Sequence, residues 1–304
     1  MFRPIGSLQD ADAGAQASRA SHASSSVTLF SPLLLPHGRW LTFGPPVPVM
    51  GIVNATPDSF SDGGAFVTPE AAAAHGARLA AEGAAILDIG GESTRPGAIP
   101  VAADEEVARV IPVIAALGGL VETPISIDTS KALVAAAAIA AGATVVNDVW
   151  GFQRDPEMAR VVADSGAAAV LMHNRTQADP TLDVIADVLG FLSRSIDLAL
   201  SAGVAEARLI VDPGFGFGKT PAQNLALIRR LGEISALGRP VLLGVSRKST
   251  IGALTGQTRP ADRLAGSLAA GLIGVANGAA ILRVHDVAPH VQALRVAQAI
   301  ATAP

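Results

Sequence analysis

The chain has 304 residues, of which 50% are hydrophobic and 16% are charged, so it can bury one sizeable core without a second domain. Its formal net charge of −4, with acidic and basic residues dispersed along the chain, offers no basic footprint for nucleic acid. The absence of cysteine excludes disulfides, thiolate catalysis and cysteine-bound metal, and no apolar run reaches the roughly 20 residues of a membrane span.

The first 38 residues predict an amino-terminal extension, which leaves 39–304 as the folded domain. Residues 9–26 are small, polar and rich in alanine and serine, as in a flexible tail. Residues 27–35 predict a short strand that pairs with 40–43 across the floor of the fold. Asp10 and Asp12 precede this short apolar stretch and Pro32 interrupts it, so we do not expect a signal peptide.

Eight apolar runs predict buried strands, and each is followed by a segment with helical spacing. The strands are expected at 47–54, 85–90, 124–128, 144–148, 167–173, 208–212, 240–246 and 279–286. The helices are expected at 69–82, 104–117, 130–141, 155–165, 182–202, 222–237, 261–277 and 287–303. This alternation predicts an α/β fold with a parallel sheet, and eight units in one chain of domain size favour a single closed (β/α)8 barrel, the TIM barrel, over an open doubly wound sheet.

Residues typical of helix starts and ends support these boundaries. Pro69, Pro156 and Pro221 stand near expected first turns, and Asp104 and Asp155 are candidate caps for the helices that they precede. A glycine follows the expected end of most of the helices.

The first two strands are followed by long polar segments, 54–64 and 88–97. Both are longer than an ordinary βα connection, and their glycines can act as hinges, so they predict lid loops that close over a substrate. Turn chemistry is the alternative, because Thr-Pro-Asp-Ser and Asp-Gly-Gly form turns in many contexts.

Polar side chains also end the later strands, where a barrel places its active site. Asp128 ends the third strand, Asn147 and Asp148 end the fourth, and Asp212 ends the sixth. Asp128 or Asp148 alone can equally cap the next helix. Together, Asp128, Asn147 and Asp212 suit a flat heterocycle rich in N–H donors, such as a 2-amino-4-oxo-pyrimidine edge.

Basic groups follow the second and seventh strands and lie at the end of the eighth. Arg95, Lys248, Arg283 and His285 can neutralise a phosphate or diphosphate, and the start of a helix at Ser249 can bind a second anion. The carboxylates are too dispersed for a metal cage. A metal here is expected to be Mg²⁺ that bridges phosphate oxygens and touches the protein once or twice.

The segment from Asp212 to Thr220 contains a Gly-Lys-Thr sequence but is not a Walker loop. That loop needs a glycine where this chain has Pro213, which has no N–H to donate to phosphate. The alternating glycines and phenylalanines instead indicate a backbone held close to a flat ligand. A glycine-rich turn with no ligand is the alternative.

Four of these segments resemble motifs of the dihydropteroate synthase family, the folate-pathway enzymes that sulfonamides inhibit. They are MGIVNATPDSFSDGG from Met50, GGESTRPG from Gly90, DPGFGFGK from Asp212 and SRKS from Ser246. They occur in the order of the family, and the resemblance extends from Met50 to about Val296. It implies a cytoplasmic, homodimeric TIM-barrel transferase that condenses 6-hydroxymethyl-7,8-dihydropterin diphosphate with 4-aminobenzoate, with Mg²⁺ as cofactor.

The resemblance also implies a role for each matching residue. The pterin would be bound by Asp128, Asn147, Asp212 and Lys248. The diphosphate would be held by Arg283, His285 and a Mg²⁺ bound to Asn54. The 4-aminobenzoate would be surrounded by Thr94, Arg95, Pro96, Phe217 and Ser249. The family's reaction is dissociative, and the catalytic groups it implies are Asp128, Lys248, Arg283 and Asp58.

Two departures from the family pattern concern the surroundings of the site. Ala132 stands where the family often has proline, which should alter helix initiation only slightly, and the region around Arg175 varies, so its role stays open. Two rival functions also stay open: a methyltransferase-type pterin-binding barrel and a paralogue that binds pterin without catalysis. The diphosphate-binding segments argue against the first, and the complete loops argue against the second.

Overall fold

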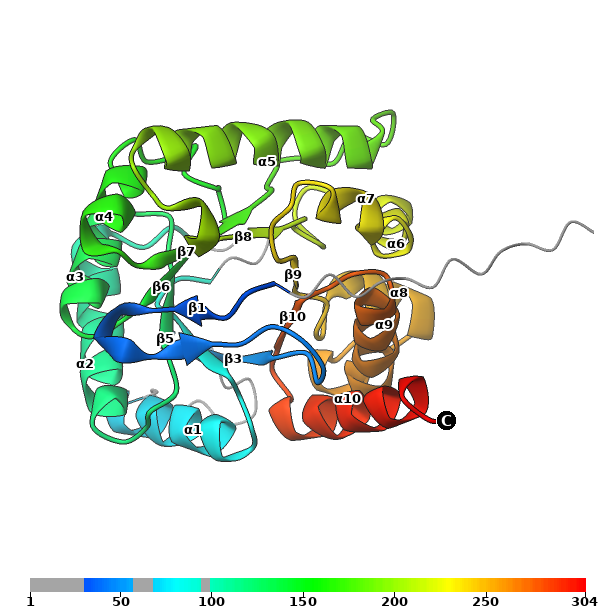
Figure 1. Cartoon of the computed structure of the whole chain (residues 1–304), viewed down its shortest axis with the longest axis horizontal. Coiled ribbons are helices and arrows are strands. Elements are labelled where there is room, and N and C mark those ends of the chain that lie inside the picture. The colour runs from blue at the N-terminus through cyan, green and yellow to red at the C-terminus, as the bar shows by residue number, and fades with distance from the viewer. Residues whose placement is uncertain (1–29, 57–67, 94–98) are drawn as a thin grey trace, which may run out of the picture.

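The computed structural model describes residues 30–56, 68–93 and 99–304 of the chain. Within these residues the main sheet has eight parallel strands in the order β8-β7-β6-β5-β4-β3-β10-β9. The strands are β3 (Val49–Asn54), β4 (Ile86–Gly90), β5 (Ile125–Asp128), β6 (Val145–Asp148), β7 (Ala168–Met172), β8 (Leu209–Asp212), β9 (Leu242–Leu243) and β10 (Ile281–Val284). A parallel bridge between Val211 and Val241 joins the two outer strands, so the sheet closes into the predicted barrel (Figure 1).

Helices surround the strands (Figure 1). They are α1 (Pro69–Ala81), α2 (Ala103–Gly118), α3 (Ala132–Ala140), α4 (Met158–Ser165), α5 (Val184–Ser201), α6 (Pro221–Arg229), α7 (Leu231–Ser235), α8 (Ser249–Thr255), α9 (Leu264–Ala276) and α10 (Val287–Ala301), with short 3-10 turns at Pro36–Gly38, Glu206–Arg208 and Pro260–Arg263. No helix in the described ranges combines the length and apolarity needed to cross a membrane.

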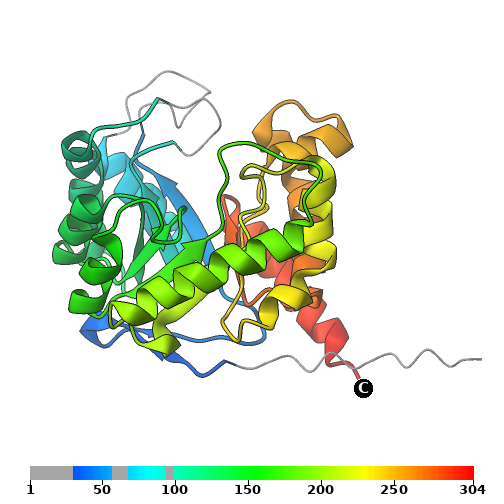
Figure 2. The ribbon, with the colours of Figure 1, turned by 90° about the horizontal axis from the view of Figure 1, so that it is seen from above.

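A two-stranded hairpin closes the amino-terminal end of the barrel. β1 (Leu33–Leu34) pairs antiparallel with β2 (Trp40–Leu41), which confirms the predicted pairing although both strands are shorter than expected. Leu33, Leu35 and Leu41 are buried against the apolar residues that fill the barrel, among them Met50. The hairpin lies along the lower edge of the molecule in Figure 2. The barrel floor is therefore plugged by side chains.

The hydrophobic residues form two layers of core. One layer lies inside the barrel and joins the hairpin to the inward-facing strand residues. The other lies between the strands and the helices. In α9, Gly271 and Gly274 are buried and face Leu282 and Leu243, where an added methyl group would be crowded or overlap. The small residues of this helix therefore allow it to pack closely on the barrel.

Strand β9 is shorter than the expected strand over 240–246. Pro240 provides no N–H for the ladder, and after Leu243 the chain leaves the sheet and enters a turn in which Arg247 has a φ of +59°. Arg247 is held there by an ion pair with Asp286 and by a 2.9 Å hydrogen bond from its N–H to Ser267 Oγ. The shortened strand thus leads into the turn that carries Lys248.

The helix boundaries differ from the expected ones in two further places. The expected helix over 222–237 is divided into α6 and α7 at Arg230, and the segment before α9 forms the additional short helix α8. Asp104 lies in the first turn of α2 but is not its cap. Asp155 is not the cap of α4, although its Oδ1 accepts a 3.1 Å hydrogen bond from the N–H of Glu157, just before that helix; its Oδ2 accepts a 2.8 Å hydrogen bond from the N–H of Ala132, at the start of α3. It therefore stabilises the neighbouring helix.

Candidate active site

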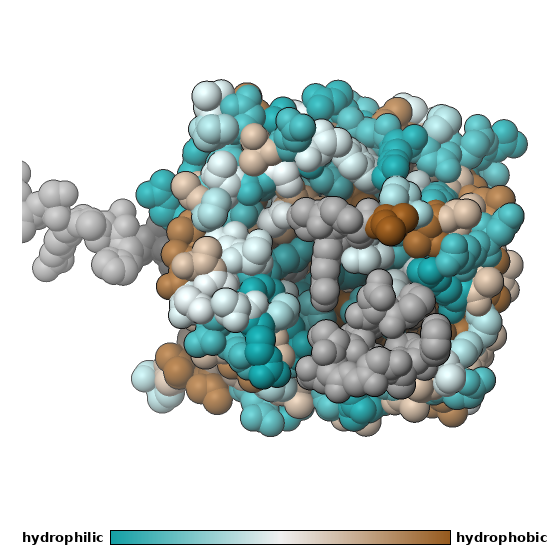
Figure 3. Space-filling model, turned by 180° about the vertical axis from the view of Figure 1, so that it is seen from behind, coloured by the Kyte–Doolittle hydropathy of each residue, from teal (hydrophilic) through white to brown (hydrophobic). Residues whose placement is uncertain are grey.

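A pocket opens at the carboxyl ends of the strands, opposite the hairpin, and Figure 3 views the molecule from this side. Parallel strands bring their carboxyl ends to one end of a barrel, which explains why residues far apart in sequence meet here. The pocket is lined by Asp128, Asn147, Val149, Met172, Asp212, Phe215, Phe217, Gly244, Lys248 and Arg283. Six of the predicted site residues are thus brought together.

Arg283, on β10, connects three strands at the base of this pocket. Its Nε donates to Asp88 Oδ2 at 2.6 Å, and its Nη2 donates to Asp128 Oδ2 at 2.7 Å. Asn147 Nδ2 donates to the same Asp88 oxygen at 3.0 Å. The guanidinium is therefore directed by two carboxylates, and Asp88 orients both Arg283 and Asn147.

Asp88 is a functional residue that the sequence reasoning missed. It is fully buried in the middle of β4, and its Oδ1 has no hydrogen-bond partner among the described residues. A carboxylate inside an otherwise apolar predicted strand is the signal that could have identified it, because such a group is rarely buried without a partner.

Burial raises the pKa of Asp128 to about 7, and the nearby Asp88 carboxylate adds to this effect, whereas Arg283 opposes it. Burial also disfavours the charge on Arg283, but the two carboxylates together raise the pKa of that guanidinium. Asp128 Oδ1 is buried and has no hydrogen-bond partner in the described chain. It is therefore an acceptor available to a ligand that supplies an N–H.

Asp212, at the end of β8, is held by the loop that follows it. Its Oδ1 accepts a 2.7 Å hydrogen bond from the N–H of Gly214. Burial raises the pKa of Asp212 to about 6, while the Gly214 N–H and the charges of Lys248, Arg283 and Lys219 act in the opposite direction. Since Asp212 lines the pocket, it presents a second buried acceptor there.

Lys248 and Phe217 form another part of the pocket lining. The Lys248 ammonium lies 4.1 Å from the centre of the Phe217 ring, within the range of a cation–π interaction. Gly216, with a φ of +86°, faces the Lys248 side chain, where an added methyl group would lie 3.2 Å from its Cδ. The glycine-rich segment therefore packs against the side of Lys248.

The remaining predicted residues have different positions. Asn54 ends β3 and is half-buried, Ser249 is exposed at the start of α8, and His285 Nδ1 lies 3.1 Å from Ser246 Oγ. These three residues do not contribute to the pocket lining given above. Asp148 faces a turn, where it accepts hydrogen bonds from the N–H groups of Trp150 and Phe152 at 2.8 and 2.7 Å. The sites predicted at Asp58, Thr94, Arg95 and Pro96 lie outside the described residues.

The donor set bears on whether a metal fits this site. In residues 30–56, 68–93 and 99–304 there is no cluster of three acidic or histidine side chains able to enclose an ion. Asn54, half-buried at the end of β3, has a single amide oxygen. Mg²⁺ commonly keeps few protein ligands and takes the others from phosphate and water. The residues therefore fit a Mg²⁺ that arrives with a diphosphate.

Comparisons with known proteins agree with this geometry. The model of the family described as "Pterin binding enzyme" matches residues 50–285. The chain is 48% identical to the dihydropteroate synthase of Bacillus subtilis (strain 168) over 239 residues, which cover 79% of this chain and 83% of the relative.

Two solved structures of dihydropteroate synthase from Xanthomonas albilineans have the same fold. The structure with 4-aminobenzoic acid has 53% identity and a TM-score of 0.84, covering 88% of this chain and 97% of the other. The complex with 7,8-dihydropteroate has 49% identity and a TM-score of 0.82, covering 90% of this chain and 100% of the other.

Proposed function

This chain belongs to the family of pterin-binding enzymes, and on that basis we propose that it catalyses the dihydropteroate synthase reaction of folate biosynthesis. It joins 6-hydroxymethyl-7,8-dihydropterin diphosphate to 4-aminobenzoate and yields 7,8-dihydropteroate and diphosphate. The observation that carries this proposal is the set of Asp128, Asn147 and Asp212, which come from three strands and line one pocket with Lys248 and Arg283.

The pterin occupies the deep part of the pocket in this proposal. Its amino and ring N–H groups are donors, and Asp128 and Asp212 offer buried carboxylate oxygens to them. Asn147 is oriented by its hydrogen bond to Asp88, and Lys248 can donate to a ring acceptor. A site of this kind rejects ligands that lack the donors, because its buried acceptors would then remain unpaired.

In this proposal the diphosphate lies beside the pterin, where Arg283 and His285 bind it. Asn54 is the protein ligand proposed for Mg²⁺, which would supply positive charge to the phosphate oxygens of the leaving group. The chain itself contributes the guanidinium of Arg283, which Asp88 and Asp128 hold in a fixed direction. Fixed charges cost little reorganisation when the leaving group develops its own charge.

The reaction proceeds by loss of diphosphate and then attack by the amine. The bond between the pterin methylene carbon and the bridging oxygen breaks, and its electron pair leaves with the diphosphate. The amine of 4-aminobenzoate forms the new C–N bond and releases a proton. Asp128 and Asp58 are the carboxylates proposed to stabilise the intermediate cation, while Lys248 orients the pterin ring.

The 4-aminobenzoate occupies the outer part of the site. Phe217 provides an apolar surface beside Lys248, and the exposed start of α8 at Ser249 can receive the carboxylate. Thr94, Arg95 and Pro96 complete this part in the proposal, although they fall in a segment that the structure leaves undescribed. The similar enzyme from Xanthomonas albilineans was solved with 4-aminobenzoic acid, which supports the assignment.

The direct test is to incubate the purified chain with the pterin diphosphate, 4-aminobenzoate and Mg²⁺ and to measure dihydropteroate by mass. Product is expected only when both organic substrates are present. Binding of the pterin diphosphate without product would instead support a non-catalytic pterin-binding protein. Neither binding nor product with competent substrates would contradict the proposal.

The same family membership is the basis for proposing a homodimer in the cytoplasm. On the outer surface, Ile273 of α9 and Val296 of α10 are 55% and 60% exposed, so apolar area is available there for a second copy. Sedimentation equilibrium should give twice the chain mass of 30.6 kDa. A single species at the chain mass across the micromolar range would contradict the dimer.

A further inference from the structure

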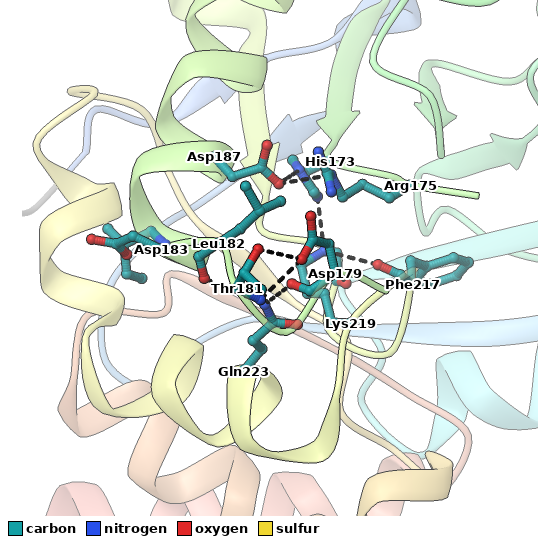
Figure 4. A network of polar contacts seen from close by, with 12 residues as sticks. His173, Arg175, Asp179, Thr181, Leu182, Asp183, Asp187, Phe217, Lys219 and Gln223 are labelled. Atoms are coloured by element: carbon teal, nitrogen blue, oxygen red, sulfur yellow. Dashed lines mark hydrogen bonds and ion pairs between the residues drawn. The ribbon is translucent and has the colours of Figure 1, made fainter. Parts of the chain in front are cut away.

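Lys219 lies at the end of the loop that carries Phe217, next to His173 (Figure 4). Its Nζ donates to the carbonyl oxygens of Gly214 at 2.9 Å and Phe217 at 3.0 Å, and it lies 2.8 Å from His173 Nδ1. An ammonium has three protons to donate, so these three acceptors use all of them. Lys219 therefore ties two points of the loop to the segment that follows β7.

His173 extends this contact into the protein. Because its Nδ1 accepts from Lys219, its proton is on Nε2, which donates to Asp187 Oδ2 at 3.0 Å. Arg175 Nε contacts the same Asp187 oxygen at 3.0 Å. Burial, together with the charges of Lys219 and Arg175, lowers the pKa of His173 to about 3. The histidine is thus a neutral relay between Lys219 and Asp187.

Two glycines allow the loop to lie directly on this relay. Gly214 has a φ of +69°, and a methyl group added to it would overlap the carbonyl oxygen of His173. Gly218 has a φ of +55°, and a methyl group there would overlap the carbonyl oxygen of Arg175. The rear of the loop is therefore in backbone contact with the relay, while Phe217 on the loop lines the pocket and faces Lys248.

The use of lysine at this position is selective. The chain has 22 basic residues, of which only Lys131, Lys219 and Lys248 are lysine. An ammonium is a compact centre that can donate to three acceptors around one nitrogen, whereas the guanidinium of arginine is a wide planar fork. The arrangement around Lys219 requires the first kind of donor.

We propose that Lys219 is a positioning residue for the amine substrate. By holding the Phe217 and Gly214 carbonyls against His173, it keeps the Phe217 ring beside Lys248, where 4-aminobenzoate binds. This inference rests on the proposed function. It assigns a role to a charged group that lies outside the pocket lining and acts through Phe217.

The charge of Lys219 is sensitive to pH because the side chain is largely enclosed. Burial lowers the pKa of Lys219 to about 7; the nearby carboxylates of Asp212 and Asp187 act to raise it, and the cations of Arg175 and Lys248 act to lower it further. A neutral amine has only two protons to donate. One of the three acceptors is then left without its bond as the pH rises.

The first test is Lys219→Met, which preserves the apolar stem and removes every donor. We expect kcat/KM for 4-aminobenzoate to fall roughly 10- to 100-fold through KM, since two or three hydrogen bonds that fix the loop are lost. The affinity for the pterin diphosphate, measured by isothermal titration, should change by no more than about twofold. Equal losses for both ligands would indicate general unfolding of the site and would overturn the proposal.

Chemical rescue separates the charge from the rest of the side chain. Since the chain contains no cysteine, Lys219→Cys introduces a unique thiol. Alkylation with 2-bromoethylamine restores an ammonium at the length of lysine, whereas S-methylation gives a neutral control. In the aminoethylated protein the KM for 4-aminobenzoate should fall back close to the value of the parent protein. In the methylated protein it should stay raised. Equal recovery by both would show that the ammonium is not required.

One measurement does not depend on turnover. Nitrogen-15 NMR of His173, assigned with His173→Gln, should show Nδ1 as an acceptor that does not titrate between pH 5 and about 7, and its resonance should move in Lys219→Met. If no variant forms product but this shift occurs, the proposed function fails while the contact stands. An unchanged resonance together with an unchanged KM would overturn the role of Lys219.

Discussion

Arg283 shows at the level of single residues how charge is tolerated in this pocket. It pairs with Asp88 and Asp128, so the base of the pocket contains two carboxylates around one guanidinium. Removing the guanidinium would leave both carboxylates buried without a counter-charge, with only the Asn147 hydrogen bond on Asp88, at a cost of about 3–5 kcal/mol. Loss of activity in Arg283→Ala would therefore combine lost anion binding with lost stability.

A substitution at Asp212 separates ligand binding from stability better than Arg283→Ala does. Asp212→Asn keeps the size of the side chain but replaces one acceptor oxygen by a donor, so pterin affinity at pH 8 should fall by about 1–3 kcal/mol. In the parent, the same affinity should fall as the pH decreases through about 6, where the carboxyl group becomes protonated. The variant should lose the component of this acid dependence near pH 6 and keep the component near pH 7, where the carboxyl group of Asp128 takes up its proton, as measured by isothermal titration between pH 5 and pH 8.

Asp148 provides the matched control for Asp212. Burial also raises its pKa to about 6, but its oxygens bind backbone N–H groups of a turn outside the pocket. A carboxyl group with a raised folded pKa takes up its proton earlier in the folded state, so the folded protein gains stability from it as the pH falls from 6 toward 4. Because Asp148 lies outside the pocket lining, Asp148→Asn should change stability but leave the acid dependence of pterin binding near pH 6 in place. If Asp148→Asn and Asp212→Asn both lost this acid dependence, the assignment to Asp212 would be refuted.

Lys219 predicts opposite pH trends for stability and activity. Its folded pKa of about 7 is below the usual 10.5, so between these values the unfolded chain holds a proton that the folded chain has released. The contribution of Lys219 to the free energy of unfolding therefore rises with pH over that window. Activity toward 4-aminobenzoate should fall as the pH rises through about 7, where the folded chain loses this donor, and should stay low over the rest of the window.

The comparison with Lys219→Met isolates this contribution. Urea unfolding of both proteins at several pH values should show the parent gaining stability relative to the variant from pH 7 to about pH 10. A parallel decline of activity and relative stability would mean that Lys219 is simply part of the fold.

At the level of elements, the eight strands and most helices could be predicted because each buried strand is a mostly apolar run and glycine or proline marks many boundaries. The errors occurred where tertiary contacts decide the conformation. β9 ends early because Asp286 and Ser267 hold Arg247 in a turn, and the carboxylate of Asp155 serves α3. Neither contact is visible in local sequence.

The loop after β8 depends on one glycine in particular, and a second glycine with the same backbone angle tests it. Gly214 and Gly238 both have a φ of +69°, but an added methyl group meets the His173 carbonyl at Gly214 and no atom within 4 Å at Gly238. Gly238→Ala should cost about 1 kcal/mol from backbone strain. Gly214→Ala should cost more and should also weaken 4-aminobenzoate binding; denaturant midpoints and titration measure the two effects.

That comparison would contradict the proposed packing if the two variants had equal stability and unchanged affinity. Equal costs would show that positive φ alone determines the penalty. The carbonyl of His173 would then have room to move away, and the loop would not be fixed by its contact with the relay.

At the level of the whole molecule, the barrel brings together the residues that end separate strands. Asp128, Asn147, Asp212, Lys248, Arg283 and Phe217 could be selected from the sequence because strand ends and family motifs mark them. Asp88 and the relay of Lys219 and His173 could not, since their importance comes from side chains that meet only in the folded chain. Sequence therefore indicated the residues that line the pocket better than the groups that orient them.

The pocket has one part proposed for the pterin diphosphate and another proposed for 4-aminobenzoate, and this arrangement predicts an order of binding. If diphosphate and Mg²⁺ hold the segments 54–64 and 92–97 closed, 4-aminobenzoate should bind weakly alone and markedly more tightly when both are present. Most of both segments lies outside the described residues, so titration calorimetry in the two conditions is the direct measurement. Equal affinity would show that closure does not complete the second site.

Because the hairpin closes one end of the barrel, the pocket is open only at the carboxyl ends of the described strands. Leu33, Leu35 and Leu41 occupy the end opposite the pocket, so the described part of the barrel is closed at that end. Ligands must therefore enter and leave through the open end, so the ligand bound deepest has to bind first and dissociate last. A bulky inhibitor bound at the open end would consequently block the binding of further ligands and would slow dissociation of the deeper ligand without contacting it.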